Sequence, residues 1–183
     1  MKLQDLIKTK YPIIQGGMAN IATGEFAAAV SNAGALGLIG SGGWDHEKVR
    51  EEIKICKSLT DKPFGVNLML MNPDADAIAQ VLFEEKIPVI TTGAGSPGKY
   101  VELWKSAGSI VIPVVASVAL AKLMVRAGAD AVIAEGGESG EAATETDDGE
   151  RTDCRGVAGP VRQPAGQEPD RERSEYVHPE RPP

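Results

Sequence analysis

Short apolar runs alternate with amphipathic stretches along the first 140 residues of the chain. Each run is apolar at nearly every position, which is typical of a strand buried on both faces of a parallel sheet. The runs begin near residues 12, 36, 64, 88, 110 and 131, so the repeat is 21 to 28 residues long. This spacing leaves room for one helix after each strand. The pattern therefore predicts six strand–helix units.

The stretches between the apolar runs carry the signals of helix ends. Thr23, Asp45 and Ser117 stand where a side chain can cap the first turn of a helix. Pro73 suits the first turn of another helix, because its missing N–H has no partner there in any case. The expected helices occupy residues 24–32, 46–58, 99–107 and 118–127, and one more opens at residues 72–74.

Six such units predict an α/β fold in which helices cover a parallel sheet. Two architectures have this pattern, a doubly wound open sheet and a (β/α)8 TIM barrel. The first strand is not followed by Gly-x-Gly-x-x-Gly, which weighs against a dinucleotide-binding doubly wound sheet. The regular units and the glycine-rich strand exits favour the barrel, truncated after about six βα units.

The composition changes after Gly140. Residues 141–183 contain six arginines and six prolines but no Lys, Leu, Ile, Phe or Met. Such a segment cannot bury enough apolar surface to offset the entropy lost on ordering. We therefore expect part of a barrel over residues 1–140 and a disordered, non-homologous tail over 141–183. A changed reading frame, a replacement tail and an evolved disordered tail all explain the change, and its abruptness favours the first.

Charge and composition exclude several classes of function. The net charge is −7 and the sequence has no basic patch, so nucleic acid is not an expected partner. No run approaches the roughly 18 apolar residues of a membrane-spanning helix, and the first residues do not form a secretory signal. The two cysteines form neither a disulfide framework nor a metal-ligand spacing. We expect a cytoplasmic protein without a metal site.

In a barrel, the functional residues lie at the carboxyl ends of the strands. Here these ends carry glycine, amide and hydroxyl groups, and no Lys or Arg. Such a rim suits a flat, polar heteroaromatic ring rather than a phosphate alone. The strongest candidates are the turn Gly16, Gly17 and Met18, and Asn67 within an apolar strand. A buried amide such as that of Asn67 needs several hydrogen-bond partners, which a ligand can supply. Glu135 ends the last apolar run, where its carboxylate either belongs to a site or caps a neighbouring loop.

Six motifs carry a resemblance to one family. They are YPIIQGGMA at 11–19, AGALGLIG at 33–40, KPFGVNLM at 62–69, TTGAGSP at 91–97, IPVVASVALA at 112–121 and GADAVIAEG at 128–136. With these motifs the chain resembles the nitronate monooxygenase and enoyl-acyl-carrier-protein reductase II family, and the reductase branch most of all. The resemblance covers residues 1–140. It implies a TIM barrel that holds FMN, which NADH or NADPH reduces in the reductase branch.

The resemblance also implies particular site residues. Cofactor contacts are expected at six positions, namely Gly16, Gly17, Met18, Asn67, Glu135 and Gly140. The family's catalytic histidine falls at the position of Ala142, whose methyl group cannot move a proton. No catalytic residue is therefore expected in this chain.

Three functions follow from the resemblance. The first is reduction of an enoyl group on an acyl carrier protein by NAD(P)H through FMN, in fatty acid biosynthesis. The second is oxidation of alkyl nitronates by FMN and O2. The third is an inactive truncated fragment, since strands seven and eight, which hold the flavin phosphate in this family, have no counterpart here. Open barrel edges would then favour a homo-oligomer or aggregation.

Overall fold

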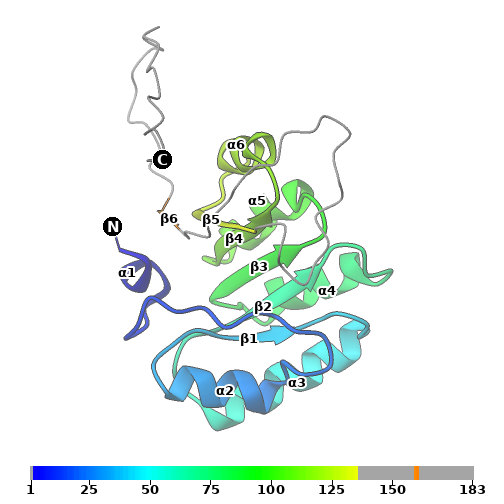
Figure 1. Cartoon of the computed structure of the whole chain (residues 1–183). Coiled ribbons are helices and arrows are strands. Elements are labelled where there is room, and N and C mark those ends of the chain that lie inside the picture. Colours follow the sequence, from blue (N-terminus) through cyan, green and yellow to red (C-terminus); the bar gives the residue numbers. More distant parts are fainter. Residues whose placement is uncertain (1, 136–158, 161–183) are drawn as a thin grey trace, which may run out of the picture.

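The structure, a computed structural model, describes residues 2–135 and 159–160. Its six strands form one sheet in the order β1 to β6 (Figure 1). The pairs from β1 to β5 are parallel, and β6 runs antiparallel to β5. The strands are β1 (Gly37–Gly40), β2 (Phe64–Met69), β3 (Val89–Gly93), β4 (Ile110–Val115), β5 (Ala131–Ala134) and β6 (Gly159–Pro160).

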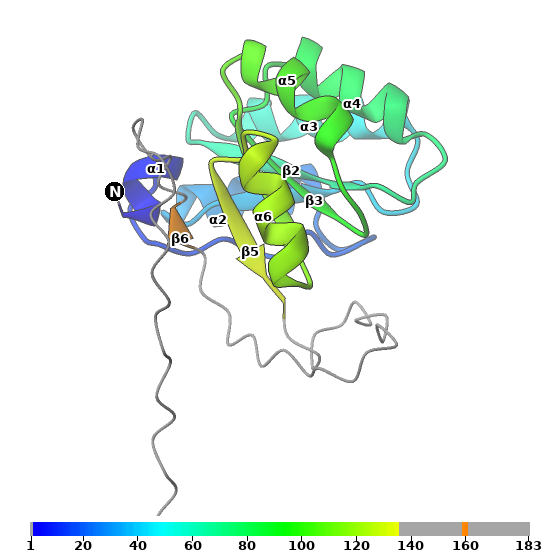
Figure 2. The same cartoon turned by 90° about the horizontal axis from the view of Figure 1, so that it is seen from above.

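Helices follow the strands and cover one face of the curved sheet. They are α2 (Gly24–Asn32), α3 (His46–Leu59), α4 (Ala75–Glu84), α5 (Gly98–Ser106) and α6 (Val118–Arg126). A short helix that the sequence pattern does not predict, α1 (Leu3–Ile7), lies apart from this layer and beside β6 (Figures 1 and 2). None of the described helices has the length and apolar character that crossing a membrane requires.

The predicted helix caps are confirmed at three positions. The side chains of Thr23, Asp45 and Ser117 each accept a hydrogen bond from the backbone N–H three residues further on, at 3.2, 2.8 and 3.1 Å. The prediction for Pro73 is wrong, because α4 begins at Ala75. The Asn72 side chain accepts a hydrogen bond from the Asp74 N–H at 2.8 Å, and this turn precedes the helix.

The strand expected near residue 12 is reduced to an isolated parallel bridge between Ile14 and Leu36. The Leu36 N–H donates to the Ile13 carbonyl, and the Gln15 N–H donates to the Leu36 carbonyl, both at 2.9 Å. Pro12 has no N–H to extend this ladder. On the other side the chain turns at once, where the Met18 N–H donates to the Gly16 carbonyl at 3.0 Å.

Both faces of the sheet are buried, as the apolar runs predict. Ile90 of β3 packs in the core between the sheet and the helices, whereas its neighbour Val89 belongs to a second core on the inner face. Ile7 of α1 also joins this inner core. Alternate residues of each strand therefore face the helices or the interior of the partial barrel. The disorder expected for 141–183 concerns residues outside the described ones, apart from Gly159 and Pro160 in β6.

Candidate functional site

A cavity of about 790 Å³ opens on the inner face of the sheet. Five of the six cofactor positions expected from the sequence line it together, namely Gly16, Gly17, Met18, Asn67 and Glu135. They come from the first extended segment, from β2 and from the end of β5. The sixth, Gly140, lies outside the described residues, as does Ala142. The volume is in the range of small-molecule sites.

Gly17 lies directly against the side chain of Asn67. A β-carbon at residue 17 would stand 2.3 Å from the Asn67 β-carbon and 2.8 Å from its Cγ, closer than atoms approach without a shift. By contrast, a β-carbon at Gly16 would meet no atom within 4 Å. The close contact explains why glycine is required at position 17 and not at its neighbour.

Asn67 and Thr91 form a buried polar pair in the interior. They are partners in the register of β2 and β3, and the Thr91 hydroxyl donates to Asn67 Oδ1 at 2.8 Å. Asn67 is 8% exposed and Thr91 is 1% exposed. Thr91 uses one of the two lone pairs of Oδ1, and the amide NH2 of Asn67 is the group that can donate to a ligand.

Thr91 also lines the cavity, although the sequence analysis did not single it out. The signal that could have found it is the alternation along β3. Thr91 is two residues from Val89, an inner-core residue, so the two side chains share the inner face. A threonine beside an asparagine on that face places two polar side chains in an otherwise apolar interior.

Gln15 lines the cavity, and its side chain forms hydrogen bonds with the backbone around it. Its Oε1 accepts a hydrogen bond from the Leu38 N–H at 2.8 Å, and its Nε2 donates to the Gly16 carbonyl. The side chain thus ties the glycine turn to β1. We assign Gln15 a positioning role, which its place in the motif alone did not indicate.

Ser41 and Asn72 join two loops at the carboxyl ends of β1 and β2. Ser41 is fully buried, its N–H donates to the Asn67 carbonyl, and its hydroxyl accepts from the Met69 N–H, both at 3.1 Å. The Asn72 side chain donates to the carbonyls of Ser41 and Trp44 at 3.1 and 2.7 Å. These bonds fix the backbone beside the cavity residues Asn67 and Met69.

A hydrogen-bonded histidine–aspartate pair also connects these two loops. Asp74 Oδ2 lies 2.6 Å from His46 Nδ1 and accepts from the His46 N–H, also at 2.6 Å. The hydrogen bond to Asp74 raises the pKa of His46, and the same contact lowers the pKa of Asp74. His46 is partly exposed and links the start of α3 to the start of α4.

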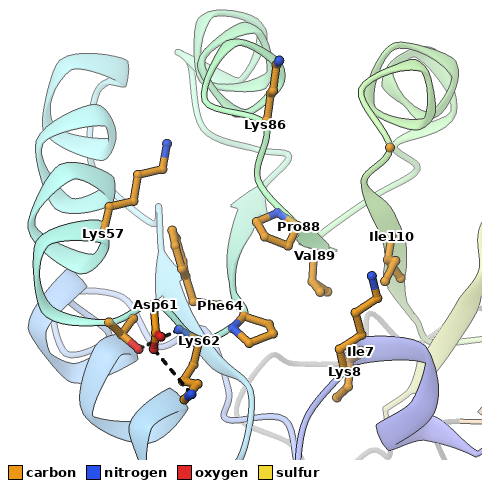
Figure 3. A pocket seen from close by; sticks show the side chains of 13 residues that line it. Ile7, Lys8, Lys57, Asp61, Lys62, Phe64, Lys86, Pro88, Val89 and Ile110 are labelled. Atoms are coloured by element: carbon orange, nitrogen blue, oxygen red, sulfur yellow. Dashed lines mark hydrogen bonds and ion pairs between the residues drawn. The ribbon is translucent and has the colours of Figure 1, made fainter.

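A second cavity, of about 410 Å³, lies at the amino-terminal ends of β2, β3 and β4 (Figure 3). Four lysines surround it, but Lys57 already donates to the carbonyl and carboxylate of Glu85 at 3.0 and 2.7 Å, and Lys86 points away from the cavity (Figure 3). Cations are favoured at helix C-termini, which end on this side of the sheet. Lys57 is therefore already paired, and the first cavity, which the expected cofactor positions line, is the candidate site.

The sequence model of the nitronate monooxygenase family matches residues 1–87 and 74–157. The chain belongs to this family. The second matched range runs past Gly140, the position at which the composition changes, and reaches residue 157.

Three relatives show what the chain is similar to. FabK from Thermotoga maritima is 53% identical over 75% of this chain and 44% of its own, with a TM-score of 0.74. A probable nitronate monooxygenase from Staphylococcus haemolyticus is 31% identical over 76% of this chain and 49% of its own. A (3aS,4S,5R,7aS)-5-hydroxy-7a-methyl-1-oxo-octahydro-1H-indene-4-carboxyl-CoA dehydrogenase from Rhodococcus jostii is 35% identical over 75% of this chain and 39% of its own.

The structural match confirms the predicted fold class, an α/β fold of the truncated TIM-barrel type. The family resemblance drawn from the six motifs is likewise confirmed. The chain spans less than half the length of each of these three relatives.

Proposed function

We propose that the chain carries the flavin-ring half of an FMN-dependent oxidoreductase site, of the type that reduces an enoyl thioester with NADH or NADPH. The observation that carries this proposal is the convergence of five family cofactor positions on one cavity. Those positions come from segments more than 100 residues apart in sequence, and the fold alone brings them together.

The residues present fit a flavin ring. The cavity combines apolar walls with a few polar groups, as sites for aromatic cofactors do. Gly17 keeps the backbone close to Asn67, and a side chain there would fill the space beside the amide. Asn67 offers an NH2 donor to a ring acceptor, while the backbone of the Gly16 turn offers further polar groups.

Each side chain has a separate role in this proposal. Asn67 would bind the ring edge, Thr91 would orient Asn67, and Met18 would contact the ring by its thioether. Glu135 and Gly140 would complete the cofactor site after β5. When bound, FMN supplies hydride transfer between the nicotinamide and the substrate, and the protein supplies binding, orientation and exclusion of water.

The substrate class follows from the relatives. FabK, an enoyl-acyl-carrier-protein reductase, is more than half identical to this chain over the shared part. The name of the Rhodococcus jostii relative also specifies an acyl thioester, here of coenzyme A. We therefore propose an enoyl thioester as substrate, in which the enoyl group is attached to an acyl carrier protein or to a small carrier.

Oxidation of alkyl nitronates by FMN and O2 is the second candidate. The family whose sequence model matches is named for it, and the Staphylococcus haemolyticus relative is a probable nitronate monooxygenase. This reaction needs no nicotinamide. The compound that reduces the flavin therefore distinguishes the two candidates.

The test is anaerobic reduction of flavin bound to the purified chain. We expect NADH or NADPH to bleach the visible flavin absorbance, and crotonyl thioester to restore it only slowly, in a single turnover. Bleaching by an alkyl nitronate alone would favour the second candidate. Steady turnover is expected to be negligible, because Ala142 stands where the family has its histidine. A chain that binds no flavin would contradict both candidates.

A further inference from the structure

We propose that the second cavity, at the amino-terminal ends of β2, β3 and β4, binds a small aliphatic monocarboxylate. The partner of the carboxylate is the ammonium group of Lys8, which follows α1. This site is separate from the cavity on the inner face of the sheet, and it depends neither on a flavin nor on the proposed reaction.

Lys8 is held at the cavity by the end of α1. The preceding residue, Ile7, is 1% exposed and packs in the inner core with Val89. The Lys8 N–H donates to the Gln4 carbonyl, and Lys8 adopts the left-handed conformation with φ 56°. Figure 3 shows its side chain extending toward Val89 and Ile110, which line the same cavity. A fixed backbone therefore places the ammonium group at this cavity.

The other three lining lysines have different partners or directions. Lys57 donates to the Glu85 carboxylate at 2.7 Å. Lys62 lies 3.5 Å from the Asp61 carboxylate, and Lys86 points away from the cavity (Figure 3). Among the four lysines, the Lys8 ammonium is thus the one available to a ligand, which suits a single negative charge. The carboxylates of Asp61 and Glu85 would repel a dianion such as a phosphate monoester more strongly.

Apolar side chains form much of the remaining lining. Phe64 is buried, whereas Pro63, Pro88 and Ile110 keep part of their surface exposed. A short hydrocarbon chain can cover these three side chains while its carboxylate reaches Lys8. The volume of about 410 Å³ lies in the range of small-molecule sites. Each methylene that leaves water should strengthen binding about twofold to fourfold.

The ends of three helices set the expected strength of binding. Helices α3, α4 and α5 end on this side of the sheet, where their terminal carbonyls carry partial negative charge. This charge opposes the attraction between the carboxylate and Lys8. We therefore expect a dissociation constant on the order of 1 mM.

The experiment is a titration of the 15N-labelled full chain with sodium hexanoate, followed through its amide chemical shifts. We expect saturable shifts at Lys8, Gly108 and Ile110. Hexan-1-ol has the same chain without the charge, and acetate has the charge without the chain, so each should bind at least about tenfold more weakly. Shifts confined to Asn67 and Thr91 of the inner-face cavity would overturn the inference. So would the absence of saturable shifts up to roughly 20 mM hexanoate.

Two variants make the test specific to Lys8. Lys8→Gln keeps a polar side chain without the charge and should weaken hexanoate binding by roughly tenfold. Lys122→Gln removes an exposed lysine of α6 that does not line this cavity, and this matched control should leave the affinity unchanged. Equal affinities of Lys8→Gln and the unaltered chain would overturn the inference. Flavin affinity should be the same in both variants, so the two proposals can fail independently.

Discussion

The hydroxyl of Thr91 donates to Asn67 Oδ1 at 2.8 Å across β2 and β3, inside the partial barrel. The adjacent residue, Thr92, is also fully buried, but its hydroxyl has no hydrogen-bond partner in the part of the chain that the structure describes. Two consecutive threonines therefore have opposite surroundings. One belongs to the candidate site and the other does not.

Thr91→Val should weaken flavin binding by about tenfold and destabilise the fold by about 1–3 kcal/mol. The reason is that Asn67 Oδ1 loses its buried donor and the amide is no longer held in one orientation. Fluorescence titration and urea unfolding measure the two effects. Thr91→Ser keeps the hydroxyl and should retain most of the affinity.

Thr92→Val is the matched control for that substitution. It removes a buried hydroxyl that has no described partner, so the free energy of unfolding should stay unchanged or rise. Flavin affinity should not change. Equal losses in both valine variants would show that the Asn67 contact has no special role.

Gly17→Ala should destabilise the chain by about 1–3 kcal/mol and abolish flavin binding, because the new methyl group overlaps the Asn67 side chain. Gly16→Ala should be tolerated, since a β-carbon there meets no atom within 4 Å. Thermal unfolding and flavin titration of the two variants give the comparison. A stable, flavin-binding Gly17→Ala variant would contradict the contact between residues 17 and 67.

Glu52→Gln should destabilise the fold by about 1–3 kcal/mol at neutral pH. The buried Glu52 carboxylate accepts from the Gly24 N–H at 2.7 Å and pairs with Lys48 at 2.9 Å. Glu51→Gln is the control, because Glu51 pairs with the same lysine but is 62% exposed. The control should change the free energy of unfolding little.

The same carboxylate predicts a pH dependence. Burial raises the pKa of Glu52, but the contacts with Lys48 and the Gly24 N–H outweigh it, so the pKa lies below its ordinary value of 4.5. A lowered pKa means that the stabilisation is present above pH 4.5 and is lost as the pH falls through the lowered pKa. Unfolding curves over this acidic range should converge for the unaltered chain and Glu52→Gln. Curves that stay parallel would contradict this assignment.

Cys56 should resist thiol reagents as long as the chain is folded. It is fully buried on α3, and burial raises the pKa of its thiol to about 12, so almost no thiolate forms near neutral pH. A Cys154→Ser variant leaves Cys56 as the single thiol. Labelling of that variant should follow urea unfolding, and rapid labelling under native conditions would contradict the burial.

Much of the architecture could be predicted from local sequence. The apolar runs located β1 to β5, and Thr23, Asp45 and Ser117 marked helix starts, because capping depends on residues close in sequence. Two predictions about the bounds of elements were wrong, and both concern residues beside a turn. The strand near residue 12 shrank to the Ile14 bridge, and α4 began after Pro73, where local hydrogen bonds at the turns took precedence.

The candidate site was predictable in part. Glycine turns and Asn67 stood out because they interrupt apolar runs, and the family motifs pointed to the same residues. Gln15 and Thr91 were missed, because their importance lies in bonds to Leu38 and Asn67, which are more than 20 residues away. The spacing of residues along the sequence does not show which distant side chains form such contacts.

The sequence by itself determined the α/β class, the strand–helix repeat, the caps and the family, because these depend on periodicity and on motifs read within one unit. The tertiary structure decided that Gly17 packs on Asn67, that Thr91 orients the amide, and that Glu135 faces the same cavity. The physical reason is that strand register and sheet curvature set which distant side chains meet. Those quantities arise only when the parallel strands pair.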